Sequence, residues 1–221
     1  MKRLFATFSA LVCGALVLAG CGSSPAAPSQ TQAPVGTDAQ QQSAPADFSA
    51  DAVQPMLDVI AVSMAQTDVE GFSERPGDAF FTYFAYTVLN TELLDSAALF
   101  DTGEIDLMSG NVTIPSGGLQ KLYDAFFAAP GAFPAVQTQD SFFTAQDEGY
   151  VYGLSDAGDL MYSATVQQAQ TLADRKVQLT VALNRGDAVE DWETVFATCT
   201  VVLQQQPDAP YGYTIVSVQA N

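Results

Sequence analysis

Histidine is absent from this chain of 221 residues, and basic residues are scarce: seven lysines and arginines stand against 25 aspartates and glutamates. Without histidine, the chain cannot form Ser-His-Asp or Cys-His nucleophilic systems, nor a zinc site with histidine ligands. Proteins that bind double-stranded nucleic acid neutralise its phosphates with lysine and arginine. Because the formal net charge is −18 and no basic cluster is present, we expect no nucleic-acid partner.

Cysteine is also scarce. Cys13 and Cys21 belong to the N-terminal segment, so Cys199 is the only thiol in the rest of the chain. An internal disulfide in the folded part is therefore excluded, and its stability must come from a hydrophobic core. About 175 residues follow position 46, and a domain of that size buries around 70% of the surface that its unfolded chain exposes. No spacing of side chains indicates a cofactor, a resident metal ion or a catalytic set.

The N-terminus has the layout of a secretory signal. Lys2 and Arg3 precede a mostly apolar run over residues 4–19, which is shorter than the roughly 20 apolar residues of a membrane-spanning helix. The run ends in Leu18-Ala19-Gly20-Cys21, where small residues lead directly into a cysteine. An ordinary secretory signal would end in an A-x-A-like cleavage site instead.

These four residues resemble the lipobox of bacterial lipoproteins. The resemblance covers residues 1–21 and implies cleavage between Gly20 and Cys21, with a diacylglyceryl group on the Cys21 thiol. Two acyl chains form a stable anchor, whereas a single chain gives only reversible attachment. We therefore expect the chain on the extracytoplasmic face of the cell membrane, held there by the lipid on Cys21. The alternative is a short N-terminal anchor helix that is never cleaved.

The mature chain would be more acidic than the precursor. Loss of Lys2 and Arg3 leaves five basic residues against 25 acidic ones, a net charge of about −20, which anionic headgroups repel. Residues 22–46 consist mainly of Ser, Pro, Ala, Gln, Gly and Thr, a composition that cannot bury enough apolar surface to become ordered. A flexible coil of about 25 residues spans roughly 25–30 Å. The expected organisation is a signal peptide over 1–20, a lipidated tether over 21–46 and one globular domain over 47–221.

Apolar residues recur every three or four positions in three segments, which predicts three helices. The first covers about 51–66 with Asp51 as its N-cap, the second runs from Asp78 toward residue 94, and the third runs from Ser116 to the break at Pro130. We expect their apolar stripes to form the core: Val53, Leu57, Ile60, Met64, Phe80, Phe81, Phe84, Ala85, Val88, Leu119, Leu122, Tyr123 and Phe126.

The rest of the chain predicts strands. Segments 104–108 and 111–114 give a weak hairpin signal around Ser109-Gly110, and 132–146 is expected to be a loop anchored by Phe142 and Phe143. Further strands are expected at 150–154 and 160–167, forming a hairpin, and then at 177–183, 195–203 and 211–218. Apolar residues on both faces of the last strand suggest a central or doubly covered position in the sheet.

Helices followed by an antiparallel meander indicate an α+β domain, with about three N-terminal helices packed on a curved antiparallel sheet of four or more strands. This order resembles the NTF2-like superfamily, in which a curved sheet wraps around helices to form a cone. The resemblance covers residues 51–221 in element order only. A cystatin-like or an unrelated α+β sheet would show the same order.

Acidic residues gather in several places. Calcium sites need several oxygen ligands on a tightly turned loop, and neither acidic cluster has the spacing of a calcium-binding loop, so we interpret both as solvated loops. The two clusters are Asp101, Glu104 and Asp106, and Asp187, Glu190, Asp191 and Glu193. The NTF2-like resemblance implies a second role, acid–base catalysis by paired carboxylates in a cavity. The candidate pairs are Asp147 with Glu148 and Asp156 with Asp159.

Two further features have both a functional and a packing interpretation. Trp192, together with Tyr150, Tyr152, Tyr211 and Tyr213, has the composition of an aromatic surface for a glycan or peptide, but strand packing explains the same residues. Cys199 falls in the inward row of a predicted strand, where a buried thiol behaves as a small hydrophobic group.

We therefore expect a membrane-anchored lipoprotein whose domain is a non-catalytic binding module for an envelope protein, peptide or glycan. The alternatives are an NTF2-like cavity enzyme that uses pocket carboxylates and a small solute-binding receptor. The domain is small for two lobes around a cleft, which disfavours the receptor. A deep pocket with a buried carboxylate would favour the enzyme, whereas a core filled by Phe81, Phe84, Leu122 and Phe126 would leave the outer surface as the working part.

Overall fold

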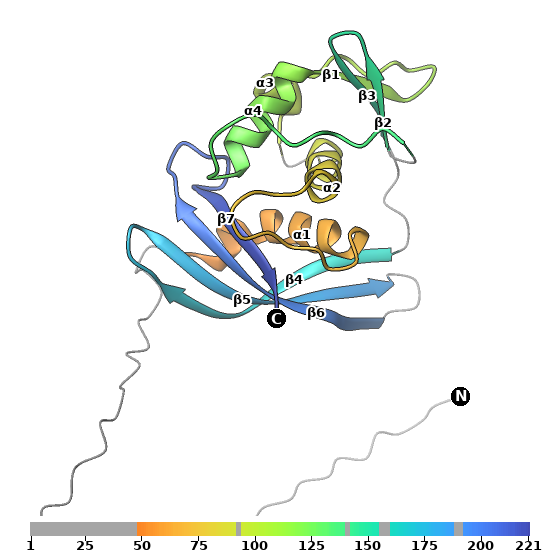
Figure 1. Cartoon of the computed structure of the whole chain (residues 1–221). Helices are drawn as coiled ribbons and strands as arrows, with labels where there is room; N and C mark the ends of the chain where they lie inside the picture. Colours follow the sequence, from red (N-terminus) through yellow and green to blue (C-terminus); the bar gives the residue numbers. More distant parts are fainter. Residues whose placement is uncertain (1–47, 92–93, 140–141, 155–159, 188–191) are drawn as a thin grey trace, which may run out of the picture. The chain divides into compact units, whose positions relative to one another are not determined.

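A computed structural model describes residues 48–91, 94–139, 142–154, 160–187 and 192–221. The expected signal peptide, the tether and the pair Gly20-Cys21 lie outside the described residues. The described residues all belong to one compact unit. Its fold is α+β, as predicted, with helices and two antiparallel sheets of three and four strands (Figure 1).

The helices in the described part are α1 (Ala50–Gln66), α2 (Asp78–Leu89), α3 (Ser96–Phe100) and α4 (Ser116–Phe126). The three predicted helices are confirmed, with differences at their ends. Ser49 occupies the N-cap position of α1 and Asp51 lies in its first turn. α2 ends at Leu89, well before residue 94. The five-residue helix α3 was not predicted, because it is too short for a repeating apolar pattern.

The four-stranded sheet, called here the large sheet, is an antiparallel meander of β4 (Leu160–Thr171), β5 (Lys176–Asp187), β6 (Trp192–Gln205) and β7 (Tyr213–Ala220). Figure 1 shows α1 lying across one face of this sheet, with α2 and α4 beyond it. The predicted inward row of β6 is confirmed for Cys199, Val201 and Leu203, which are fully buried. It is wrong for Val195, which is 54% exposed, because the pairing with β5 shifts by one residue between Ala197 and Val195. Burial raises the pKa of the Cys199 thiol to about 12, so the thiol stays protonated and inert.

The three-stranded sheet, called here the small sheet, corrects the predicted strand pairing. It consists of β1 (Asn111–Pro115), β2 (Phe143–Gln146) and β3 (Gly149–Gly153), with β3 in the centre. The predicted hairpin between 150–154 and 160–167 is therefore wrong, and the expected loop at 132–146 ends in β2. The Asp147-Glu148 turn joins β2 to β3 with two residues, and closing such a short loop costs little entropy.

The last strand, β7, lies at the edge of the large sheet, which corrects the prediction of a central position. A bulge between Val202 and Leu203 leaves Val216 without a partner on β6. The extra residue reverses the side-chain alternation, so that Tyr213, Ile215 and Val218 are all buried on the core side. The apparent apolar pattern on two faces is therefore one face interrupted by a bulge.

Loops cover the outer edge of β7. The Phe72 N–H donates to the Val218 carbonyl at 2.6 Å, and the Val218 N–H donates back to Phe72 at 2.9 Å. The Ala128 N–H donates to the Ile215 carbonyl at 2.9 Å. Exposed strand edges invite pairing with other chains, and these contacts occupy the backbone groups that would otherwise template it.

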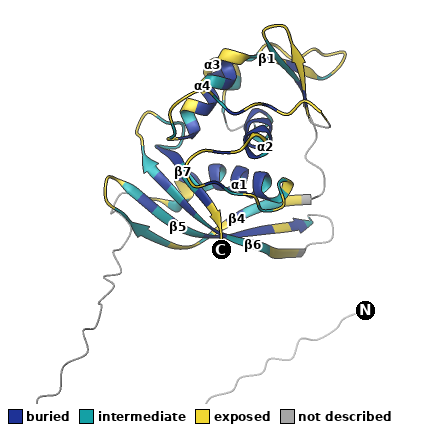
Figure 2. Cartoon of the chain, viewed as in Figure 1, coloured by how far each residue is buried: buried dark blue, intermediate teal, exposed yellow. Residues whose placement is uncertain are grey.

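Figure 2 shows buried residues on the helices and on the large sheet, and aromatic side chains make up much of this core. The Phe84 ring lies 4.9 Å from the Phe127 ring and 5.3 Å from the Phe126 ring, centre to centre, and Phe81 lies 5.8 Å from Tyr123. The four residues whose burial distinguishes a filled core from an open cone are all at most 1% exposed: Phe81, Phe84, Leu122 and Phe126. The outer surface is therefore the place to look for function.

Candidate functional site

The two predicted acidic clusters do not form a metal site in the described part of the chain, where no three cysteine or carboxylate side chains are placed to share an ion. Asp101 pairs with Lys121 at 2.6 Å, and both side chains are half exposed. Glu193 accepts a hydrogen bond from the Ser163 hydroxyl at 2.9 Å. Glu190 and Asp191 lie outside the described residues. Glu104 and Asp106 occupy an exposed loop, as the solvated interpretation predicts, whereas Asp187 is a partly buried residue at the end of β5.

The predicted catalytic pairs are not assembled into a buried site. Asp147 and Glu148 form the exposed turn between β2 and β3, beside an open surface pocket of about 550 Å³. Asp156 and Asp159 lie outside the described residues. Neither Asp147 nor Glu148 is surrounded by apolar side chains of the core, so the structure offers no desolvated acid at this position.

One carboxylate does have the raised pKa expected of a cavity acid, and the sequence did not single it out. Asp58 lies on α1 against the outer edge of β4, and burial raises the pKa of its carboxyl above the usual 3.8. Its Oδ1 accepts hydrogen bonds from the Ala164 N–H and from Gln54 Nε2, both at 2.8 Å. Gln54 also donates to the Ala164 carbonyl at 2.7 Å. The pair thus replaces the missing neighbour strand of β4 and has a structural role.

Asp58→Asn is expected to keep or raise the free energy of unfolding near neutral pH. The asparagine oxygen can accept the same two hydrogen bonds, and the charge that burial disfavours is removed. Because its folded pKa is raised, Asp58 contributes stability that is fully present below about 3.8 and is lost as pH rises through the folded value. Urea unfolding from about pH 3 to pH 7 should show the advantage of the variant growing.

Asp58→Leu is the matched control, because it can accept neither hydrogen bond and leaves the Ala164 N–H without its partner. We expect it to be less stable than wild type at both ends of the pH range. A loss of more than about 1 kcal/mol for Asp58→Asn at pH 7 would show that the charge itself is needed.

The tyrosines of the proposed aromatic surface pack against other aromatic side chains or lie in the core. Tyr152 is 2% exposed in β3 and Tyr213 is 7% exposed in β7, and burial raises the pKa of Tyr152 to about 12. Tyr150 packs against Phe143, and Tyr211 packs against Phe126. The Trp192 side chain lies outside the described part. Packing therefore explains the four tyrosines, and burial excludes Tyr152 and Tyr213 from an exposed aromatic surface.

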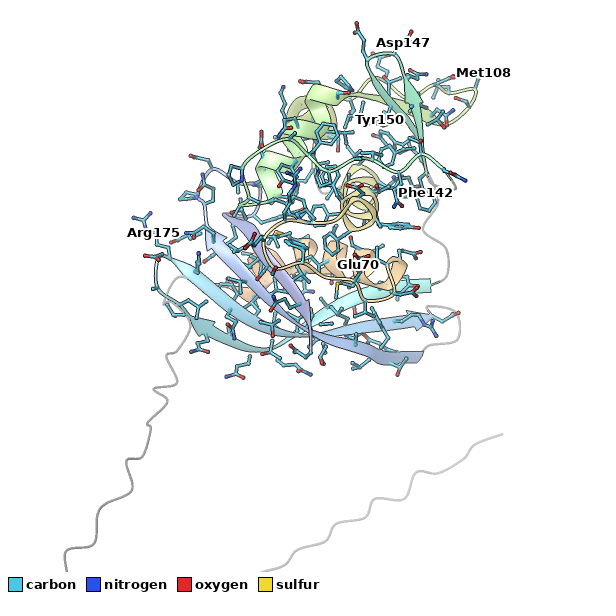
Figure 3. The ribbon with its side chains drawn as sticks, in the orientation of Figure 1. Glu70, Met108, Phe142, Asp147, Tyr150 and Arg175 are labelled. Atoms are coloured by element: carbon cyan, nitrogen blue, oxygen red, sulfur yellow. The ribbon has the colours of Figure 1, made fainter. Side chains whose placement is uncertain are left out.

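The most exposed large apolar side chains lie in the turn before β1. Leu107 is 93% exposed and Met108 is 95% exposed, and Figure 3 shows Met108 projecting from the small-sheet end of the domain. Ile105 and Leu154 flank them at 49% and 43% exposure, and the Leu154 N–H donates to the Gly110 carbonyl at 3.1 Å. These four residues are called here the apolar tip.

Asp106 fixes the shape of the apolar tip. Its carboxylate accepts hydrogen bonds from the Met108 N–H at 2.9 Å and from the Ser109 hydroxyl at 2.8 Å, and these bonds hold the pKa of Asp106 below its usual value. Its carbonyl accepts from the Gly110 N–H at 2.7 Å. Gly110 has φ +69°, a left-handed conformation that glycine adopts without strain. Several hydrogen bonds therefore hold the backbone of the turn, while the side chains of Leu107 and Met108 remain almost fully exposed.

The sequence pattern missed this surface for an identifiable reason. Ile105 and Leu107 alternate with polar residues, and this alternation predicted a strand over 104–108. In the structure, only Asp106 makes a bridge to Asn111, and the segment continues as a turn. The signal that could have found it is Met108, which breaks the alternation and places two apolar residues side by side before Ser109-Gly110.

No family model, curated protein or solved structure matches the chain. The likenesses to bacterial lipoproteins and to the NTF2-like superfamily therefore rest on the sequence features given above. None of the helices in the described residues is long and apolar enough to cross a membrane.

Proposed function

We propose that this chain is a lipid-anchored extracytoplasmic binding module that docks onto a protein of the cell envelope through its apolar tip. The observation that supports the docking step is the exposure of Leu107 and Met108, at 93% and 95%, on a turn held by Asp106. Packing cannot explain side chains that touch almost nothing. A rigid turn loses little conformational entropy when it binds, which favours affinity.

The placement of the tip suits a tethered module. In Figure 1 the chain enters the domain at α1, and in Figure 3 Met108 lies at the opposite end. A lipid on Cys21 would hold the N-terminal side of the chain at the membrane, and the tip would then be free to reach a partner. The proposed anchor rests on Leu18-Ala19-Gly20-Cys21.

The charges around the tip select a protein partner over a lipid surface. Glu104 and Asp106 are exposed within the same turn region, and the whole chain carries −18. Anionic headgroups would repel this acidic rim. A protein that presents an apolar pocket rimmed by lysine or arginine would complement it, because opposite charges at an interface rim speed association and reject wrong partners.

A photo-crosslinking amino acid placed at position 108 tests this proposal in intact cells of the native host. We expect it to give one discrete adduct with another protein, and we expect Leu107→Ser in the same chain to abolish that adduct. Met161 is the matched control, since it is also an exposed methionine, at 55%, but lies on β4 of the large sheet. The crosslinker at position 161 should not give the same adduct.

Three results would contradict the docking surface. The same adduct from positions 108 and 161 would show collision without a specific site. An adduct of twice the chain mass would assign the tip to self-association. An adduct with lipid would show that the tip contacts the membrane, against the repulsion argued from Glu104 and Asp106.

A further inference from the structure

A second surface feature lies beside the bulged edge strand β7. It is a groove of about 620 Å³ formed by the loop after Phe72, the loop after α4, the start of β5, the end of β6 and the middle of β7. Its charged and polar lining includes Arg75, Lys176, Gln204 and Glu74, and Pro130 and Val216 form part of its apolar wall.

The groove is unusual because of its cations. The chain has seven basic residues against 25 acidic ones, and two of the seven line this groove. Within the described residues, neither Arg75 nor Lys176 forms an ion pair, whereas Lys121 does so with Asp101. At the average composition of the chain, the nine lining residues would include about one acid and fewer than one base, so the two cations are an enrichment. Glu74 is the one carboxylate in the lining.

Arg75 is held in place by contacts that leave most of its donors unused. Its Nη2 donates a hydrogen bond to the Ala132 carbonyl, and its Cζ lies 5.6 Å from the centre of the Tyr123 ring. A guanidinium has five N–H donors in a planar fork that matches a carboxylate. Because the side chain is already positioned, a ligand would not have to order it.

The composition of the groove defines the ligand. Arg75 and Lys176 favour an anion, the Gln204 amide offers a polar contact, and Pro130 and Val216 favour an apolar group beside the charge. Glu74 and the net charge of −18 oppose a dianion more strongly than a monoanion. We propose that this groove binds a carboxylate that carries an adjacent apolar substituent, as a peptide C-terminus or an acylated amino acid does.

Calorimetric titration of the full chain in detergent with N-acetyl-L-leucine and with N-acetyl-L-leucinamide tests the proposal, because the two probes differ only in the carboxylate. We expect the acid to bind at least about tenfold more tightly than the amide, and its affinity to fall as salt rises. Lys176→Gln and Arg75→Gln should each weaken the acid at least about tenfold, while Glu74→Gln strengthens it.

Lys121→Gln is the control, because it removes a cation that lies outside the groove and is already paired with Asp101. It should leave the affinity for the acid unchanged. Arg75→Gln also removes the contacts to Ala132 and Tyr123, so Lys176→Gln decides the outcome if Arg75→Gln fails to fold.

A tighter affinity for N-acetyl-Gly-Gly-Leu than for N-acetyl-L-leucine would identify a peptide C-terminus as the source, and equal affinities would identify the carboxylated amino acid alone.

Equal binding of acid and amide, or no binding of the acid at about 10 mM, would overturn the proposal. Inorganic phosphate that binds as tightly as the acid would overturn the preference for a monoanionic carboxylate. None of these results depends on the apolar tip, because the groove is built from different segments.

Discussion

Cys21→Ser is expected to abolish lipidation of the chain completely. In the proposed organisation, the Cys21 thiol carries two acyl chains, and burial of each methylene contributes about 0.8 kcal/mol to membrane binding. A serine hydroxyl lacks the nucleophilic sulfur that accepts the diacylglyceryl group. Metabolic labelling with a radioactive fatty acid should therefore mark wild type and leave Cys21→Ser unlabelled. The mass of intact wild type should correspond to a chain that begins at residue 21 and carries lipid.

Cys13→Ser is the matched control, because Cys13 lies in the same apolar run but would leave with the proposed signal peptide. Its mature product should be identical in mass to that of wild type and equally labelled. Label on Cys21→Ser, or a wild-type mass that still includes residues 1–20, would contradict the anchor and support an uncleaved N-terminal helix.

Gly118→Ala and Gly117→Ala are expected to change stability in opposite directions, although the two glycines are neighbours in α4. A Cβ on Gly118 would lie 2.0 Å from the Phe100 carbonyl oxygen and 3.1 Å from Ile114 Cγ1. Relief requires α4 to move away from α3 and β1, and such overpacking costs about 1–3 kcal/mol. A Cβ on Gly117 meets nothing within 4 Å, so alanine there should gain up to about 1 kcal/mol of helix propensity.

Urea unfolding of the two variants beside wild type measures both effects. The paired design separates the contact with Phe100 from helix propensity, because both variants add one methyl group to the same helix. Equal changes in the free energy of unfolding would show that α4 does not pack against the end of α3 as described. A neutral Gly118→Ala would lead to the same conclusion.

The helices α1, α2 and α4 could be predicted because each carries an apolar stripe several turns long, which the five-residue α3 does not. The apolar stripe of α1 faces the core of the domain, as the spacing of its residues indicated: Val53, Leu57, Ile60 and Met64 are all fully buried. The strands β5 and β6 could be predicted in the same way, because the alternation of apolar and polar residues indicates which side of a long strand faces the core. These predictions depend only on neighbours in sequence.

The features that the sequence did not predict depend on distant contacts or on single residues. Asp58 binds the backbone of a strand 106 residues away, and nothing near Asp58 in the sequence marks that contact. The Val216 bulge reverses the alternation in β7 by one residue. β3 pairs with β1, a strand more than 30 residues earlier in the sequence. The periodicity of apolar residues does not indicate which strands pair. Arg75 and Lys176 meet in the groove from widely separated segments for the same reason.

The central claim is that the domain works by binding through its apolar tip, and one affinity measurement tests it most directly. The protein crosslinked from position 108 would be purified and titrated with wild type, with the double variant Leu107→Ser, Met108→Ser, and with Met161→Ser. Loss of two buried apolar anchors should weaken binding by about 100-fold or more, because residues at the centre of an interface dominate its affinity. Met161→Ser should bind within about twofold of wild type. Equal affinities for all three chains would contradict the account and remove the tip from the interface.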